Sequence, residues 1–70
     1  MVIYEAADFG KALRKRRKSL GYTQEEVSAI TGFSASFISE LERGKETAEL
    51  GKALHLANML GMDLEMKERE

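Results

Sequence analysis

The stretch from Thr23 to Lys45 reads TQEEVSAITGFSASFISELERGK, and it decides the fold that we expect for this chain. Its first four residues form a capping box. In such a box the Thr23 hydroxyl accepts from the amide three residues on, and the Glu26 carboxylate accepts in return from the Thr23 amide. An apolar spacing of helical period follows directly. These signals predict a helix over about residues 24–31.

A second helix is expected after a very short turn. Only Gly-Phe-Ser at 32–34 separates the two, and Ser34 is placed to cap a helix over about residues 35–43. Two helices joined by such a turn have the spacing of a DNA-binding helix-turn-helix, whose second helix enters the major groove. Its outer face is small and hydrogen-bonding, which suits close approach to base edges but is also compatible with an ordinary polar surface. That face consists of Ala35, Ser36, Ser39 and Arg43, with Glu40 at its edge.

Two further helices are expected on either side of this unit. One covers about residues 8–20 and the other about residues 48–60, and a glycine that can adopt the left-handed conformation follows each. The pattern therefore predicts one mainly α-helical domain over residues 1–70. The side chains expected to face its core include Phe9, Leu13, Leu20, Val27, Ile30, Phe37, Ile38, Leu41, Leu50, Ala53, Leu54, Ala57 and Leu60.

The C-terminal residues have a different period. Residues 62–67 alternate apolar and polar side chains, which is typical of a β-strand. Because a strand cannot exist alone, we expect it to pair across a dimer or with residues 1–4 of the same chain. The alternatives are a frayed terminus and a tail that folds back over the last helix.

The composition excludes several classes of function. The 70 residues include no cysteine, and the one histidine cannot hold zinc alone, so no disulfide, metal or other cofactor is expected. No nucleophile has a plausible base and no glycine-rich phosphate loop occurs, so we do not expect an enzyme. The N-terminus lacks a signal-peptide pattern, and no apolar run reaches the roughly 18–20 residues of a membrane helix. A cytoplasmic protein is expected.

A net charge of −1 conceals a local excess of positive charge. Six of the eleven basic residues fall within positions 11–18, before the capping box. A local basic patch attracts phosphates whatever the net charge, although a solvated helix face is the alternative interpretation. Arg14 and Lys18 are the candidates for phosphate contacts in this run.

A second apolar stripe on the last helix predicts a homodimer. A core of this size has little spare stability, which favours association with a second copy. Leu56 and Met59 lie away from the expected core face, and with the tail they give more apolar surface than a small monomer covers well. The expected interface consists of Leu56, Met59, Met62, Leu64 and Met66.

Three ordered motifs in the central stretch resemble the Cro/CI-type (XRE-like) helix-turn-helix family of bacterial and phage repressors. They are Thr23-Gln24-Glu25-Glu26-Val27, then Thr31-Gly32-Phe33-Ser34, then Ile38-Ser39-Glu40-Leu41-Glu42-Arg43-Gly44-Lys45, within a likeness that covers about residues 8–61. The resemblance implies a four-helix lambda-repressor-like fold, double-stranded DNA as the partner, and a place at the prokaryotic nucleoid.

The same resemblance implies roles for individual side chains. Gln24 would anchor a phosphate, and Arg43 and Lys45 would contact the DNA backbone. Arg17 and Glu42 would form a partly buried ion pair that locks the first helix to the third. Ser34 would also contact the DNA, and the residues that would face the bases are Ala35, Ser36, Ser39 and Glu40.

Four helices followed by Gly61-Met62-Asp63-Leu64-Glu65-Met66 are similar to the HipB-type antitoxin subgroup of this family. That likeness implies a homodimer whose C-terminal strands pair across the two-fold axis, and a repressor that binds an inverted-repeat operator. It also implies a HipA-like toxin kinase as a partner, because members of the subgroup often have one. The alternative function is a protein-interaction module whose main role is to bind and neutralise such a kinase.

Overall fold

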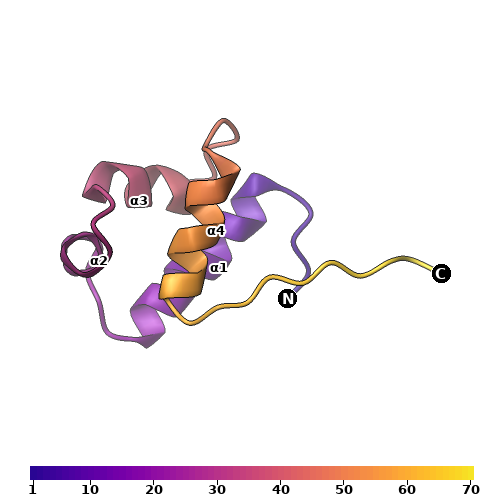
Figure 1. The fold of residues 1–70 in the computed structure, drawn as a ribbon, viewed down its shortest axis with the longest axis horizontal. Helices are drawn as coiled ribbons and strands as arrows, with labels where there is room; N and C mark the ends of the chain where they lie inside the picture. The colour runs from indigo at the N-terminus through magenta and orange to yellow at the C-terminus, as the bar shows by residue number, and fades with distance from the viewer.

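The computed structural model describes residues 1–70 and contains four helices (Figure 1). The expectation of a mainly α-helical domain is confirmed. Figure 1 shows α2 and α3 at one end of the molecule, whereas the two chain termini lie toward the other end. None of the helices is long and apolar enough to cross a membrane. The helices are α1 (Ala6–Ser19), α2 (Gln24–Thr31), α3 (Ala35–Glu42) and α4 (Leu50–Met59).

The outer two helices begin elsewhere than the apolar spacing indicated. α1 begins at Ala6 rather than near residue 8, and the Asp8 carboxylate lies inside its first turn. This carboxylate accepts from the backbone amides of Tyr4 and Glu5 at 3.1 and 3.2 Å, which satisfies donors that have no partner within the helix. α4 begins at Leu50 rather than near residue 48, because the residues before it form a turn.

The caps of α2 and α3 use the side chains that the sequence singled out. The Glu26 amide donates to the Thr23 hydroxyl at 3.1 Å, and the Thr23 amide donates to the Glu26 carboxylate at 3.0 Å. The Ser34 hydroxyl accepts from the Phe37 amide at 3.0 Å. Between these caps Gly32 has a φ of 82°, which residues with a Cβ rarely adopt. Glycine at this position therefore allows the turn to be so short.

The core draws side chains from all four helices, and one glycine sets how closely α1 and α3 approach. A Cβ added at Gly10 of α1 would lie 2.3 Å from the Leu41 carbonyl oxygen and 2.7 Å from the Glu42 carbonyl oxygen, both on α3. Only glycine fits there, so the backbones of α1 and α3 are in direct contact. The buried apolar side chains are Leu13, Val27, Ile38, Leu41, Ala53, Leu56, Ala57 and Leu60.

Four apolar side chains lie elsewhere than expected. Leu50 is 70% exposed, Ile30 is 59% exposed and Leu20 is 40% exposed, although all three were expected in the core. Leu56 was expected on a dimer surface, and it is fully buried. The inward stripe of α4 runs through Ala53 and Leu56 rather than through Leu50, because Leu50 is the first residue of the helix and no neighbouring helix covers it.

The expected strand at 62–67 is absent, so that prediction is wrong for the single chain. The last backbone hydrogen bond is donated by the Met62 amide to the Ala57 carbonyl at 3.0 Å, and no later residue makes one. Figure 1 shows the tail running away from α2 and α3 in an extended form. A strand needs a neighbour to satisfy its amides and carbonyls, and within this chain no segment forms backbone hydrogen bonds with the tail.

Candidate nucleic-acid interface

The start of α3 presents small polar side chains without charge. Ser34 and Ser36 are exposed, whereas Ala35 and Ser39 are half-buried. The first turn of α3 carries no acidic side chain to oppose the positive end of the helix dipole. The Ser34 hydroxyl already accepts a hydrogen bond as the cap, so its proton is what it can offer to a ligand. The geometry therefore suits close approach of this end of α3 to an electron-rich surface.

A buried ion pair fixes the orientation of α3. Nε of Arg17 donates to Oε2 of Glu42 at 2.7 Å, and Nη2 donates to Oε1 at 2.9 Å. The Arg17 and Glu42 side chains are 9% and 3% exposed. The remaining Nη1 donates to the Tyr22 carbonyl at 2.7 Å, which ties the turn before α2 to the same guanidinium. A bidentate pair gives geometric specificity as well as energy, so one α1 side chain positions both α2 and α3.

Gln24, expected to anchor a phosphate, is also part of this cluster. Its Nε2 atom donates to Oε1 of Glu42 at 3.1 Å. Burial alone would raise the pKa of Glu42, but hydrogen bonds from Arg17 and Gln24 outweigh it and hold the pKa below its ordinary value. The hydrogen bond with Glu42 raises the pKa of Arg17 despite burial. Because the Gln24 amide carries a second N–H, it can still serve a phosphate at the start of α2.

A second ion pair lies at the exposed end of α3. Nζ of Lys45 donates to Oε2 of Glu40 at 2.6 Å, and the two side chains are 46% and 32% exposed. This hydrogen bond and the positive charge of Lys45 lower the pKa of Glu40. Sequence reasoning placed both residues against DNA but did not pair them. The pairing depends on the reversal of the chain at Gly44, whose φ is 84°, and no helical spacing signals it. Arg43, between them in sequence, is exposed and free of side-chain hydrogen bonds.

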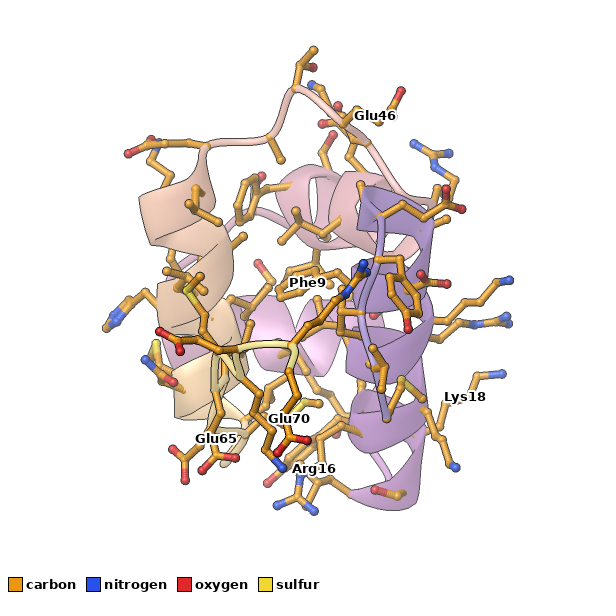
Figure 2. All side chains as sticks on the ribbon, turned by 90° about the vertical axis from the view of Figure 1, so that its right-hand side faces the viewer. Phe9, Arg16, Lys18, Glu46, Glu65 and Glu70 are labelled. Carbon is orange, nitrogen blue, oxygen red and sulfur yellow. The ribbon has the colours of Figure 1, made fainter.

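The basic run on α1 divides between surface and interior. Arg14 and Lys18, the two candidates for phosphate contacts, are exposed, and so are Lys11 and Lys15. Arg16 instead donates from Nε to the Leu60 carbonyl at 2.8 Å, at the end of α4. Figure 2 shows Lys18 projecting outward from α1. Together with the buried Arg17, two of the six charges are therefore structural, and sequence periodicity gave no sign of the Arg16 contact.

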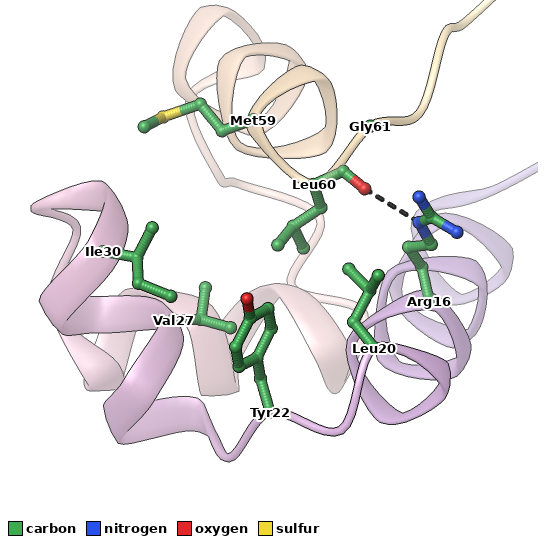
Figure 3. Close-up of a pocket in the computed structure, with 8 residues that line it drawn as sticks. All are labelled: Arg16, Leu20, Tyr22, Val27, Ile30, Met59, Leu60 and Gly61. Carbon is green, nitrogen blue, oxygen red and sulfur yellow. Dashed lines mark hydrogen bonds between the residues drawn. The ribbon is translucent and has the colours of Figure 1, made fainter.

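The residues expected at a dimer interface do not form one surface. Leu56 is buried in the core, and Met62 packs against it and is only half-exposed. Met59 lines a groove of about 290 Å³ between α1, α2 and the end of α4, where Ile30 and Tyr22 stand at the rim (Figure 3). Leu64 and Met66 are exposed on the tail.

A second apolar hollow, which sequence reasoning did not find, lies at the end of the molecule remote from α2. It has a volume of about 310 Å³ and includes Ile3, Tyr4, Leu50, Leu54 and Leu64 in its lining. Four of these side chains are among the most exposed large apolar groups of the chain. We call this set the terminal patch. Its signal in the sequence was the apolar run at residues 1–4, which was considered only as a pairing partner for the tail.

Comparison with known proteins identifies relatives of this chain. A family model described as helix-turn-helix matches residues 13–66. The uncharacterised HTH-type transcriptional regulator y4mF of Sinorhizobium fredii (strain NBRC 101917 / NGR234) is 37% identical over 60 residues, which are 86% of this chain and 79% of the relative. A second such regulator of that organism, y4dJ, is 40% identical over 53 residues, 76% and 69% of the two chains. YazB of Bacillus subtilis (strain 168) is 45% identical over 40 residues, 57% and 58% of the two.

Two solved structures share the fold. They are a HipB variant in complex with an O2 20mer and HipB in complex with an O4 20mer, each with a TM-score of 0.88 and 20% identity. Both alignments cover 100% of this chain, and they cover 97% and 99% of the HipB chains. The resemblance to the XRE-like family and to a HipB-like fold, drawn from the three motifs of residues 23–45, is confirmed.

Proposed function

This chain belongs to the helix-turn-helix family of transcriptional regulators, and we propose that it represses transcription by binding a specific inverted-repeat operator as a homodimer. In this proposal α3 enters the major groove and reads bases with Ala35, Ser36, Ser39 and Glu40, while Ser34 lies at the point of entry. A bound dimer would block the promoter by occupying it. The HipB structures in complex with 20mers support this assignment through their shared fold.

The observation that carries the proposal is that contacts with α1 hold the uncharged start of α3 in one orientation. The Arg17–Glu42 pair and the Gly10 contact fix α3 to α1 from behind, so its exposed serines form a rigid surface. A pre-organised helix loses little freedom on binding, which favours specific recognition. The exposed charges around it supply the phosphate contacts that position a helix without reading sequence. We assign these contacts to Arg14, Lys18, Arg43 and Lys45, and we add the uncharged, half-buried Gln24 as a further phosphate donor.

The homodimer is proposed on the terminal patch rather than on α4 alone. Ile3, Tyr4, Leu50 and Leu64 are exposed together, and the tail beyond Met62 has no backbone partner in its own chain. A second copy could cover this patch and pair with the tail. The apolar side chains would then leave water, and the amides and carbonyls of the tail would gain hydrogen-bond partners. In such a dimer the two α3 helices would enter successive major grooves about 34–36 Å apart.

A second candidate function is neutralisation of a toxin kinase of the HipA type. The fold that this chain shares with HipB along its whole length favours this candidate. The two functions are compatible, and they require different residues. Charge removal at Arg14 and Lys18 with Ser36→Ala and Ser39→Ala should abolish DNA binding yet leave a toxin complex intact. Co-purification with a kinase encoded in the neighbouring reading frame, before and after these changes, tests this candidate.

The experiment for the main proposal is selection of bound duplexes from a random pool, followed by titration and sizing in solution. We expect an enriched inverted repeat, a dimer by sedimentation, and an affinity that falls steeply with salt because lysines and arginines displace counterions. Single strands of the same sequence should compete poorly. A pool with no enriched sequence, or an affinity that does not change with salt, would contradict the proposal.

A further inference from the structure

Glu40 is the one acidic side chain on the face of α3 that the proposed function turns toward DNA. It stands one helical turn after Ser36 and close to one turn before Arg43, so all three share a face. Its side chain is 32% exposed, unlike that of Glu42, which is enclosed by the ion pair with Arg17. A carboxylate on a surface that meets a polyanion is unfavourable unless its charge is balanced and it finds a donor.

Lys45 balances the negative charge of Glu40. Its ammonium lies 2.6 Å from Oε2 of Glu40, close enough to offset the negative charge as α3 approaches phosphates. The contact engages Oε2 and leaves Oε1 available to a further donor. The pKa of Glu40 is lowered by the hydrogen bond and charge of Lys45, so the side chain is ionised near neutral pH and only accepts hydrogen bonds.

The major groove offers few donors to such a group. Guanine presents two acceptors there, and thymine presents an acceptor and a methyl group, so both repel or ignore a carboxylate. Adenine and cytosine each present an amino group. In adenine, however, the amino group stands beside the N7 acceptor, which faces any second oxygen unfavourably. The N4 amino group of cytosine has no acceptor beside it on its own base, and it matches one free carboxylate oxygen.

We propose that Glu40 reads the N4 amino group of a cytosine, so that each half of the operator contains a cytosine at the position facing this residue. The inference rests on the proposed function, and it adds a base to the recognition face. Lys45 acts as a positioning residue, because it holds the carboxylate charged and aimed without touching the base. The neighbouring serines can each donate or accept, so their chemistry does not single out one base.

The test is a parallel selection from one random duplex pool with four full-length proteins: the natural chain, Glu40→Gln, Glu40→Ala and Glu46→Ala. We expect the natural chain to enrich a cytosine at one position of each half-site. Glu40→Gln should change that position to adenine, because an amide can bond both N6 and N7 of adenine. Glu40→Ala should lose the preference there and keep the rest of the repeat. Glu46→Ala, which removes an exposed carboxylate beyond the end of α3, is the control, and it should retain the cytosine.

Titration of the selected duplex gives the size of the effect. Changing the cytosine pair to a thymine–adenine pair should weaken binding by the natural chain about 5- to 150-fold, and it should matter little to Glu40→Ala. Both Glu40 variants alter an exposed pair, so circular dichroism should report an intact fold.

Two outcomes would overturn the inference, and they differ from failure of the proposed function. If the natural chain enriches a repeat that lacks cytosine at that position, or if both Glu40 variants enrich the same repeat as the natural chain, Glu40 does not read cytosine. If the natural chain enriches no sequence at all, sequence-specific binding fails and this inference fails with it.

Discussion

The two ends of this molecule are specified in different ways. At the end that holds α2 and α3, contacts within one chain fix the geometry: Gly10 permits the close approach of α1 and α3, and the Arg17–Glu42 ion pair joins the two helices. At the other end, Tyr4 and Leu64 belong to an open apolar patch, and the tail has no backbone partner. The proposed recognition surface can therefore form in a single chain. The terminal patch leaves apolar surface that a second chain can cover.

The largest expected effect comes from breaking the ion pair. Glu42→Ala leaves the Arg17 guanidinium buried without its partner, which should lower the free energy of unfolding by about 3–5 kcal/mol. For a chain this short the melting temperature should fall by more than about 10 °C. Thermal melts followed by circular dichroism measure it, and Glu46→Ala, an exposed carboxylate near the same helix end, is the control. If Glu42→Ala melts at the same temperature as the natural chain, this ion pair does not stabilise the fold.

The next largest effect is expected where α1 crosses α3. Two glycine-to-alanine substitutions, one at this crossing and one on α4, should change the free energy of unfolding in opposite directions. Gly10→Ala forces a Cβ against the Leu41 carbonyl, which is backbone and cannot move aside, so it should destabilise the fold by about 1–3 kcal/mol. Gly51→Ala changes an exposed residue of α4, and the atom nearest to the added Cβ is Oε1 of Glu49 at 3.7 Å. It should stabilise by about 0.8–1 kcal/mol through helix propensity. Urea unfolding distinguishes them, and equal effects would contradict the close approach of α1 and α3.

Low pH should destabilise the end of the molecule that holds α2 and α3. The pKa of Glu42 is lower in the folded chain than its ordinary value of 4.5, so its contribution to stability is present above that value. The contribution is lost as the pH falls through the lower folded pKa, while Arg17 stays charged throughout. Urea midpoints measured from neutral pH down to about pH 3 should fall for the natural chain. Glu42→Gln should lose that part of the fall, and a parallel fall in both proteins would exclude Glu42 as its source.

The smallest effect on the helices is expected at the other end. A chain that stops after Met62 removes the tail residues that make no backbone hydrogen bond, and helicity should be nearly unchanged. Dimer dissociation should become at least about tenfold easier, since the terminal patch loses Leu64 and the second copy loses the tail with which it would pair. Sedimentation equilibrium measures this, with Glu70→Ala in the full chain as the control. A truncated chain that dimerises as well as the natural one would remove the tail from the interface.

Much of the recognition end could be predicted from the sequence because its signals are local. Thr23 with Glu26 and Ser34 with the Phe37 amide form caps, and the partners in each cap lie three positions apart. The Arg17–Glu42 pair spans 25 residues, and it came only from the family resemblance. Its third donor, Gln24, was not foreseen, because helical spacing does not reveal contacts between different helices.

The errors lie where burial depends on neighbours. On α4 several apolar stripes are compatible with the sequence, and the choice of Leu56 over Leu50 as a core residue follows from where α4 begins relative to α1 and α3. Arg16 belongs to the basic run at positions 11–18, and its bond to the Leu60 carbonyl, 44 residues away, has no signal in that run. The tail has the period of a strand, but that period cannot supply a pairing partner.

The most direct test of the central claim compares two duplexes, the selected repeat and a shuffled sequence of the same composition. The natural chain should bind the repeat at least about 1,000-fold more tightly at physiological salt. The double variant Ser36→Ala with Ser39→Ala should lose most of that preference while its salt-dependent affinity for the shuffled duplex persists. If the natural chain binds both duplexes equally, or if the double variant discriminates as well as the natural chain, the exposed face of α3 is not the surface that reads DNA.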